Sequence, residues 1–265
     1  MMERNTIQHI EFFELCEQMP DESVDMILCD LPYGTTACSW DSIIPIEPMW
    51  QAFKRIIKPR GAIVLTATEP FASRLRMSNL NMYKHDWVWD KVIGRGLQVA
   101  KYRPMQQHEQ VLCFAINSPS YYPIMVKRVK PIKGKMSSMS SSSPIKYNDG
   151  AIRIYNEKYP KSILKFQGAN IGYLHPTQKP VSLFEYLIKT YTQAGELVFD
   201  PCVGSGTTAV AAHNTGRDYI CGDFTREYVD MARERVRNSD PFKASIDKKT
   251  GVKQLSLFEN ITGVS

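Results

Sequence analysis

The chain has 265 residues, of which 43% are hydrophobic and 23% charged, a composition typical of a globular protein rather than a disordered one. No apolar run approaches the roughly 18 residues that cross a bilayer, and the first residues lack the apolar core of a secretory signal. Six scattered cysteines form no Cys-x-x-Cys pair, which argues against a disulfide scaffold or a zinc site and predicts a metal-free cytoplasmic protein.

The positive charge of the chain is concentrated in one segment. The net charge is +6, but the stretch from Tyr121 to Lys165 contains ten basic and two acidic residues and carries +8. The remainder of the chain therefore sums to −2. By itself such a charge run is consistent either with a solvated lysine-rich loop or with a surface for a polyanion.

The first part of the chain predicts buried strands around a helix. Val24–Asp30 is a short apolar run that ends in an acid and predicts a buried parallel strand. Pro48–Ile57 has helical spacing, and the apolar run Ala62–Ala67 predicts a second buried strand. Trp87–Val92 and Val111–Ile116 predict an antiparallel pair.

Periodicity is lost in residues 117–172, which contain a serine tract at 137–143, and we expect an insertion with a mobile loop there. Beyond it, strands and helices alternate, which implies parallel βαβ units and a doubly wound α/β sheet. The expected elements are a helix at Val181–Thr192, a strand at Leu197–Asp200, a helix at Ser205–Asn214, a strand at Tyr219–Asp223 and a helix at Arg226–Arg237.

A strand, a glycine-containing turn and a helix follow one another in the sequence FDPCVGSGTT, which spans Phe199–Thr208. Glycines permit the positive φ or close backbone approach that such a turn needs, and the helix N-terminus offers free N–H groups. About twenty residues on, the next strand ends at Asp223, where nucleotide-binding sheets hold ribose hydroxyls. Because the third glycine of dinucleotide-binding sequences is absent, a nucleoside cofactor without pyrophosphate fits this turn better.

A second motif, Asp30-Leu31-Pro32-Tyr33, directly follows the first buried strand. This arrangement suits a planar substrate with an amino group. The Asp30 carboxylate and the Leu31 carbonyl can each accept a hydrogen bond from the amine, and Tyr33 can stack on the ring. Four residues alone are equally consistent with a structural turn.

Together these segments resemble a known family. Asp30–Tyr33 resembles the Asp-Pro-Pro-Tyr catalytic motif of S-adenosylmethionine-dependent DNA amino-methyltransferases, and Phe199–Gly206 resembles their cofactor motif. His175–Pro180 (HPTQKP) is similar to the segment before the cofactor strand in the permuted β group, and the pair His108-Glu109 also matches. The resemblance covers residues 7–237, with the catalytic motif before the cofactor motif as in that group.

The resemblance implies a circularly permuted, Rossmann-like methyltransferase fold with a mostly parallel sheet, an inserted basic target-recognition region and S-adenosylmethionine as cofactor. It implies a catalytic site made of Asp30, Leu31, Pro32 and Tyr33. The residues implied to lie beside the cofactor are Glu11, His175, Lys179, Asp200, Pro201, Gly204, Ser205, Gly206, Thr207 and Asp223.

Two positions depart from the family pattern. Leu31 replaces the first proline, which frees one N–H and loosens φ but keeps the carbonyl thought to accept the amine hydrogen. Glu11 stands where the family often has Asp, so a contact with adenine and a solvated surface acid are equally consistent with it.

We expect four parts: residues 1–116 as the catalytic half, 117–174 as the target-recognition insertion, 175–238 as the cofactor-binding half and 239–265 as a flexible tail. Given the resemblance, the basic insertion acquires a function. We expect Lys127, Arg128 and Lys130 to neutralise phosphates of double-stranded DNA.

The tail contains Gln254-Leu255-Ser256-Leu257-Phe258, after a polar, lysine-rich stretch. This pentapeptide resembles the docking peptide with which bacterial replication and repair proteins bind the ring-shaped sliding clamp. Gln254 would be the polar anchor, with Leu255, Leu257 and Phe258 in an apolar pocket. Folding of these apolar side chains onto the protein's own surface is the alternative.

The predicted activity is methyl transfer to the exocyclic amine of a base flipped out of duplex DNA. By resemblance, Asp at the first motif position favours adenine N6, whereas Ser favours cytosine N4. Cytosine N4 methylation remains an alternative, and so does a catalytically weakened DNA-binding protein, which Leu31 would allow. Methylation of RNA, protein or a small molecule fits the motif order less well.

Overall fold

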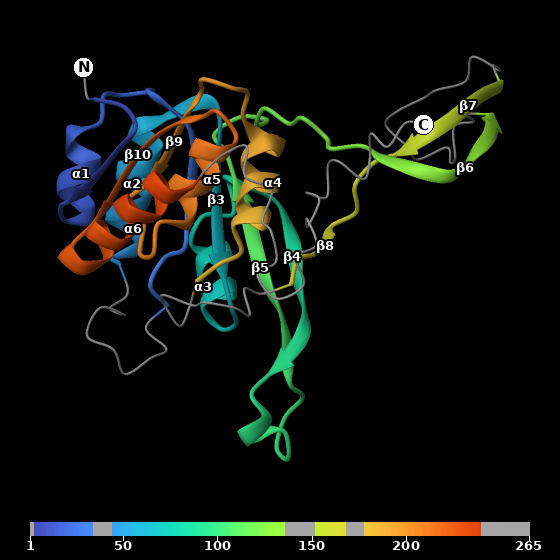
Figure 1. Cartoon of the computed structure of the whole chain (residues 1–265), viewed down its shortest axis with the longest axis horizontal. Coiled ribbons are helices and arrows are strands. Elements are labelled where there is room, and N and C mark those ends of the chain that lie inside the picture. Colours follow the sequence, from blue (N-terminus) through green and yellow to red (C-terminus); the bar gives the residue numbers. More distant parts are fainter. Residues whose placement is uncertain (1–2, 34–43, 136–151, 168–177, 240–265) are drawn as a thin grey trace. The chain divides into compact units, whose positions relative to one another are not determined.

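A computed structural model describes residues 3–33, 44–135, 152–167 and 178–239 of the chain (Figure 1). It divides into a main unit, built from residues up to Tyr122 and again from Ser162, and a smaller unit that spans Pro123–Lys161. None of the described helices is long and apolar enough to span a membrane.

The main unit alternates strands and helices along the chain. Its elements are β1 (Thr6–His9), α1 (Phe12–Gln18), β2 (Val24–Cys29), α2 (Ile46–Ile56), β3 (Ile57–Ala67), α3 (Phe71–Ser78), β4 (Tyr83–Arg95), the short 3-10 helix η1 (Leu97–Val99), β5 (Gln106–Phe114), β8 (Ile163–Lys165), α4 (Val181–Tyr191), β9 (Leu197–Asp200), α5 (Thr207–Asn214), β10 (Asp218–Asp223) and α6 (Arg226–Asn238).

The strands form one eight-stranded sheet in the order β1-β10-β9-β2-β3-β5-β4-β8. Neighbours from β1 to β3 are parallel, β5 is antiparallel to both β3 and β4, and β8 is parallel to β4. Only β5 therefore runs against the others, which confirms the expected mostly parallel, doubly wound sheet. The catalytic-motif strand β2 precedes the cofactor-motif strand β9 in the chain but lies beside it in the sheet.

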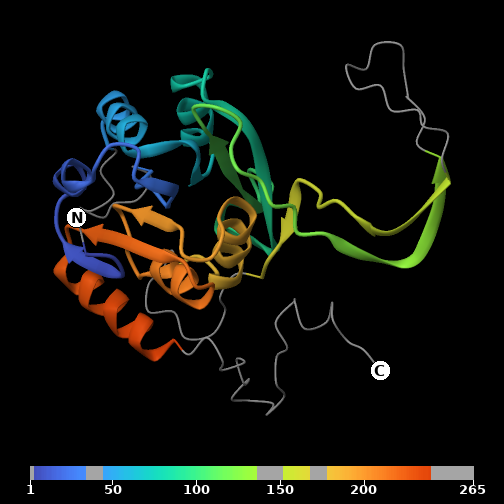
Figure 2. The ribbon, with the colours of Figure 1, turned by 90° about the horizontal axis from the view of Figure 1, so that it is seen from above.

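Helices cover both faces of this sheet (Figure 2). Successive residues of a strand point to opposite faces, and β2 divides accordingly: Ile27 packs in the core with α1, α2 and α3, whereas Met26 and Leu28 pack in the core with α4, α5 and α6. All three side chains are fully buried. Burial on both faces explains why the central strands read as continuous apolar runs.

The elements predicted at β2, α4, β9 and β10 match the structure to within one residue at each end. β3 begins at Ile57, five residues before the predicted start at Ala62. The register to β2 shifts between Val24 and Met26, so residues 58–61 form a bulge in which Pro59 needs no ladder hydrogen bond. The first strand and helix and α3 were not predicted.

The smaller unit contains β6 (Val126–Lys135) and β7 (Ile152–Lys158), which form a two-stranded antiparallel sheet. These strands occupy the stretch in which the sequence shows no periodicity. An isolated two-stranded ribbon has no buried face to impose an alternating pattern. β8, which also falls in that stretch, is an edge strand of the main sheet beside β4.

Candidate active site

The two motif strands flank the point where the sheet changes winding direction. After β2 the chain continues to β3 on one side, and after β9 it continues to β10 on the other. In open α/β sheets, ligands bind in the crevice at such a switch point, outside the carboxyl ends of the strands. Asp30 directly follows β2, and Asp200 ends β9, so both acids lie at this edge.

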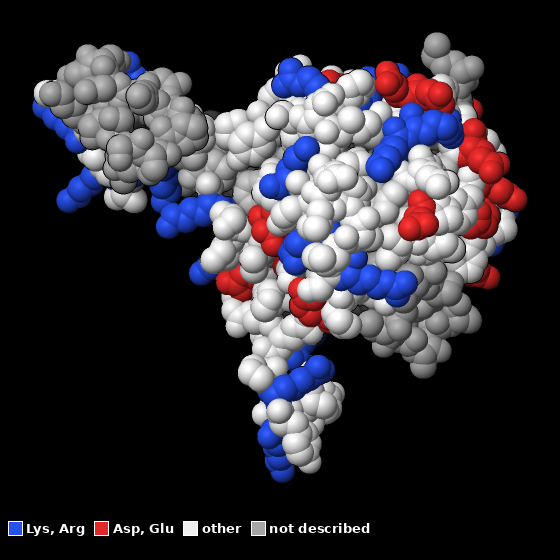
Figure 3. Space-filling view, turned by 180° about the vertical axis from the view of Figure 1, so that it is seen from behind, with Lys and Arg blue, Asp and Glu red and all other residues white. Residues whose placement is uncertain are grey.

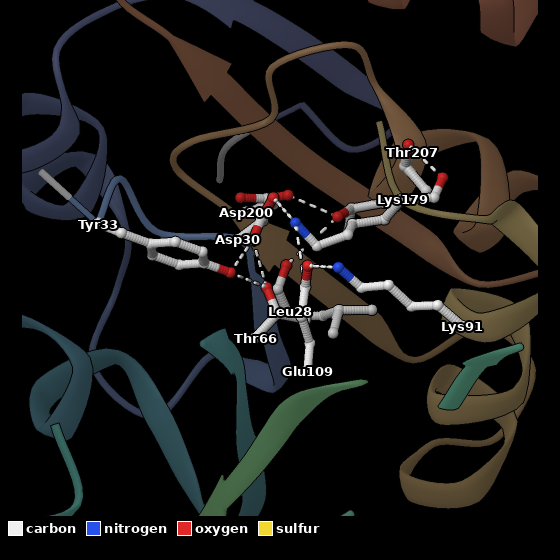
Figure 4. Close-up of polar contacts among 10 residues, drawn as sticks. Leu28, Asp30, Tyr33, Thr66, Lys91, Glu109, Lys179, Asp200 and Thr207 are labelled. Atoms are coloured by element: carbon white, nitrogen blue, oxygen red, sulfur yellow. Dashed lines mark hydrogen bonds and ion pairs between the residues drawn. The ribbon is translucent and has the colours of Figure 1, made fainter. Parts of the chain in front are cut away.

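Asp30 is the centre of a polar cluster at this edge (Figure 4). Its Oδ1 accepts hydrogen bonds from the Tyr33 hydroxyl at 2.7 Å and from the Thr66 hydroxyl of β3. Its Oδ2 forms an ion pair with Lys179 Nζ at 2.5 Å. The carboxylate is thus held on both oxygens, and its side chain is 26% exposed. It can accept a further donor from the open side.

Lys179 joins Asp30 to a second carboxylate, Glu109 of β5, whose Oε2 lies 3.7 Å from Lys179 Nζ. This Oε2 has no hydrogen-bond partner among the described residues, and Oε1 pairs with Lys91 of β4. Burial by itself lowers the pKa of Lys179, but the Asp30 and Glu109 carboxylates outweigh burial and raise that pKa above its ordinary value. Lys179 therefore remains a cation beside Asp30 at neutral pH.

Tyr33 is held through both its ring and its hydroxyl group. Its ring lies 5.4 Å from that of Phe71 at the start of α3, and Lys179 Nζ lies 5.7 Å from the ring centroid. Burial, together with the charge of Asp30, raises the pKa of the Tyr33 hydroxyl well above its ordinary value. The phenol therefore remains protonated and donates to Asp30.

Leu31 is anchored by packing in place of the missing proline. Its side chain is 3% exposed and belongs to the same apolar cluster as Cys29 and Leu65. A proline restricts the turn through its fixed φ, whereas here the buried leucine side chain ties the turn to the core. The Asp30–Tyr33 turn is thus fixed to the sheet.

The cofactor-motif turn is built around Asp200, which is 2% exposed. Its carboxylate accepts hydrogen bonds from the Cys202 N–H at 3.0 Å and from the Thr208 hydroxyl at 2.5 Å. Burial raises the pKa of Asp200 to about 7. Asp200 therefore holds the turn onto the first residues of α5, and Thr207 links that helix to the main chain of Lys179 at 3.4 Å.

Two glycines of the turn adopt the left-handed backbone conformation. Gly206 has a φ of 86°, and a Cβ there would lie 2.6 Å from the Ala232 side chain of α6, so no larger residue fits. Gly204 has a φ of 49°, and a Cβ there would meet nothing within 4 Å. The turn is therefore closed toward α6 and open at Gly204.

Asp223 ends β10 beside this open turn. Its Oδ2 accepts a hydrogen bond from the Gly204 N–H and its Oδ1 one from the Thr225 N–H, both at 2.9 Å. The side chain is buried. The acid offers hydrogen-bond acceptors, and the glycine turn and the helix N-terminus offer N–H donors. Together they form the kind of site that a nucleoside cofactor requires.

The remaining predicted site residues lie in several parts of the chain. Glu11 caps α1, with Oε2 accepting from the Phe13 N–H at 2.7 Å. His175 lies outside the described residues. Pro201 and Ser205 are buried within the cofactor turn. The predicted DNA contacts Lys127, Arg128 and Lys130 lie on β6 of the smaller unit, where Arg128 donates to the Glu157 carbonyl.

Three residues of the polar cluster were not predicted as site residues: Thr66, Lys91 and Glu109. The available signals for Glu109 were the match of the pair His108-Glu109 to the family pattern and its place two residues before the buried run that begins at Val111. Among the described residues, no group of three or more His, Cys, Asp and Glu side chains could hold a metal ion.

Comparisons with known proteins all point to the same protein family. The sequence profile N6_N4_Mtase, described as DNA methylase, matches residues 24–234. The chain is 27% identical over 249 residues to the Type II methyltransferase M.HpaI of Haemophilus parainfluenzae, covering 88% of this chain and 74% of the relative. It is 26% identical over 264 residues to the DNA adenine methyltransferase YhdJ of Escherichia coli, covering 91% and 86%.

Solved structures show the same fold. The crystal structure of the M1.HpyAVI–SAM complex has a TM-score of 0.57 and 22% identity, covering 87% of this chain and 98% of that chain. The cytosine-N4-specific PvuII DNA methyltransferase has a TM-score of 0.63 and 16% identity, covering 89% and 87%. At these identities the likeness concerns the fold.

Proposed function

The chain belongs to the DNA methylase family of S-adenosylmethionine-dependent amino-methyltransferases, and we propose that it methylates the N6 amine of adenine in double-stranded DNA. The observation that carries this proposal is the Asp30 carboxylate, fixed by Lys179 at 2.5 Å and Tyr33 at 2.7 Å at the switch point of the sheet. An acid at this motif position resembles the adenine-specific members. The relative YhdJ is named a DNA adenine methyltransferase.

The amine of adenine is a poor nucleophile because its lone pair is delocalised into the ring. In the proposed mechanism, the Asp30 carboxylate accepts a hydrogen bond from one N–H of the amine and the Leu31 carbonyl accepts one from the other. These two acceptors localise the lone pair on nitrogen and aim it at the methyl group. Catalysis then rests on positioning and electrostatics, without a covalent enzyme intermediate.

Lys179 positions Asp30 for this role. Its ammonium holds Oδ2, and Oε2 of Glu109, which has no hydrogen bond among the described residues, lies 3.7 Å from the same ammonium. The pair of carboxylates thus keeps one cation next to Asp30 throughout.

A base inside a duplex cannot reach this cluster, so the adenine is flipped out. We propose that it stacks on the Tyr33 ring, which Phe71 supports from α3. The Tyr33 hydroxyl fixes the ring to Asp30. Stacking and hydrogen bonding therefore act on the same base from adjacent residues.

When bound, S-adenosylmethionine supplies an electrophilic methyl group on its sulfonium. We propose that it is held by the turn from Asp200 to Thr207 and by Asp223, with Asp223 accepting a hydrogen bond from the ribose. Lys179 bridges the two halves, since its side chain contacts Asp30 and its carbonyl contacts Thr207. Glu11 and His175 are proposed to lie at the margin of this pocket.

Asp223→Ala is expected to weaken S-adenosylmethionine binding by about 1–3 kcal/mol, because the ribose is left without its charged hydrogen-bond acceptor. Calorimetry on the folded variant measures this. Asp218→Ala is the matched control, since Asp218 begins the same strand at its opposite end, where it pairs with Arg4. Unchanged affinity in Asp223→Ala would remove Asp223 from the cofactor site.

The basic insertion is proposed to recognise the target sequence. Replacing Lys127, Arg128 and Lys130 together by Ala should flatten the dependence of DNA affinity on salt, by about 0.9 in the log–log slope for each phosphate that is no longer neutralised. Fluorescence anisotropy with labelled duplex DNA from roughly 50 to 200 mM salt measures the slope. A slope equal to that of the parent would show that these charges are merely solvated.

We further propose that the C-terminal tail docks the enzyme on the bacterial sliding clamp through Gln254, Leu255, Ser256, Leu257 and Phe258, which lie outside the described residues. Because a short segment must be ordered on binding, the affinity should be on the order of micromolar. The proposal places the protein in the cytoplasm, on newly replicated DNA, where unmethylated strands appear.

The clamp proposal is tested by comparing the intact protein with a Leu257→Ala/Phe258→Ala variant on purified clamp. Binding by the intact protein and its loss in the variant are expected. Equal binding by both proteins, or binding by neither, would contradict docking and leave the methyltransferase assignment untouched.

The methyltransferase proposal is tested by incubating the purified protein with radiolabelled S-adenosylmethionine and unmethylated duplex DNA, RNA or a protein extract. Label in duplex DNA is the expected result. Tight DNA binding without label would indicate a scaffold that has lost catalysis, and label only in RNA or protein would overturn the assignment of the substrate.

A further inference from the structure

β4 and β5 continue past the main sheet as a two-stranded ribbon (Figure 1). β4 pairs with β8 only over Val88–Asp90, and β5 pairs with β3 only from Gln110 onward. Residues 91–108 therefore extend beyond both neighbouring strands. We name these residues the β4–β5 arm.

The arm leaves the sheet at the same edge as the catalytic motif. β5 is antiparallel to β3 and to β4, so β4 runs in the same direction as β2, and its end lies at the carboxyl edge where Asp30 follows β2. Glu109, at the base of the arm, lies 3.7 Å from the Lys179 side chain that holds Asp30. The arm is therefore continuous with the active site.

The arm is basic along its whole length. Residues 91–108 contain Lys91, Arg95, Lys101 and Arg103 and no acidic residue. In the space-filling view the projecting arm carries blue side chains, while red side chains lie at its base and on the body (Figure 3). Charge of one sign on a projecting element is complementary to a polyanion.

The tip of the arm combines this charge with exposed apolar side chains. Tyr102 is 88% exposed and Leu97 is 75% exposed. The tip is hydrogen-bonded, since the Val99 carbonyl accepts from the N–H groups of Tyr102 at 2.9 Å and Arg103 at 3.1 Å. A defined turn thus presents an aromatic ring between two cations, Lys101 and Arg103.

We propose that the β4–β5 arm is a second DNA-binding element, in which Lys101 and Arg103 contact phosphates and Tyr102 enters the gap that the flipped base leaves. This inference rests on the proposed function, because base flipping creates the gap. Proteins that unstack DNA insert side chains of this kind between bases, and aromatic rings stack on bases of any sequence. From its base to its tip, the arm reaches roughly 15–20 Å at ~3.3 Å per residue, enough to enter a groove about 8 Å deep.

The phosphate contacts are tested with a matched pair of variants. Lys101→Ala/Arg103→Ala should lower the log–log salt slope of binding to a random-sequence duplex of about 25 base pairs by about 1.8. Lys54→Ala/Arg60→Ala removes the same charge from exposed residues near the β3 start, at the opposite edge of the sheet, and should leave the slope unchanged. Equal slopes in the arm variant and the control variant would overturn the phosphate contacts.

The insertion of Tyr102 is tested with the same duplex carrying one central abasic site. The parent should bind it roughly tenfold more tightly than the intact duplex, because the ring fills a gap that is already open. Tyr102→Ala should abolish this preference and Tyr102→Phe should keep it. No preference in the parent, or an undiminished one in Tyr102→Ala, would overturn the insertion.

Both measurements are made without methyl donor, so they separate the arm from the proposed activity. DNA methylation by the parent, with binding by arm variants equal to that of the controls, would refute the arm alone. Loss of the abasic preference in Tyr102→Ala, in a protein that methylates no DNA, would support the arm and refute the activity.

Discussion

Asp30→Ala should lower the turnover of methyl transfer by on the order of 10²-fold or more, because the target amine loses its charged acceptor. Binding of S-adenosylmethionine should largely survive, since Asp200 and Asp223 are held by other partners. Turnover under saturating donor, with calorimetry of donor binding, separates the two effects.

The matched control is Asp25→Ala, which removes an acid from the amino end of the same strand, where Asp25 pairs with Lys58 at 2.7 Å. This variant should lose stability but retain turnover once folded. Methylation by Asp30→Ala at the parental rate would show that Asp30 is not the acceptor of the amine.

Lys179→Met should also reduce turnover by on the order of 10²-fold, because it removes the cation that positions Asp30. It should also lower the free energy of unfolding by about 3 kcal/mol, since Asp30 would lose its counter-ion and Glu109 would keep only Lys91. Lys179→Arg, which keeps the charge, should recover part of both losses. Lys58→Met breaks a Lys–Asp pair at the other end of β2 and serves as the control.

A double-mutant cycle distinguishes positioning from a merely structural role. If Lys179 acts through Asp30, adding Lys179→Met to Asp30→Ala should cost little further turnover, because the carboxylate that it positions is already absent. If the fold-losses in turnover of the two single variants multiply in the double variant, Lys179 acts independently of Asp30.

Much of this fold was predictable because both faces of its central strands are buried. The apolar runs that became β2 and β9 read as parallel strands, and the acids that end them, Asp30 and Asp200, are where ligands bind in such sheets. The glycines of the cofactor motif predicted a tight turn, and the structure shows why one of them is needed: Gly206 has no room for a side chain next to Ala232.

Contacts between distant segments could not be predicted from local patterns. Thr66 and Glu109 lie in strands β3 and β5, and although the pair His108-Glu109 matched the family pattern, only the fold shows that both residues approach the Asp30 and Lys179 pair. Glu11 is a further case, because the resemblance left an adenine contact and a solvated surface acid open, and only the structure shows that its carboxylate caps α1. Both cases depend on tertiary geometry.

The length of the β4–β5 arm could not be predicted from the sequence either. The sequence between the two predicted strands reads as a polar connection that contains glycine, and only the pairing of β4 with β5 shows how far it extends. The register between Asp90 and Arg95 also shifts, so alternation could not place these side chains.

The identity of the methylated base shows whether Asp30 directs methyl transfer to adenine N6. Unmethylated genomic DNA is incubated with the parent and with Asp30→Ala, digested to nucleosides and analysed by mass spectrometry. We expect N6-methyladenine with the parent and, with the variant, a yield lower by on the order of 10²-fold or more. N4-methylcytosine as the sole product, or equal N6-methyladenine from both proteins, would contradict it.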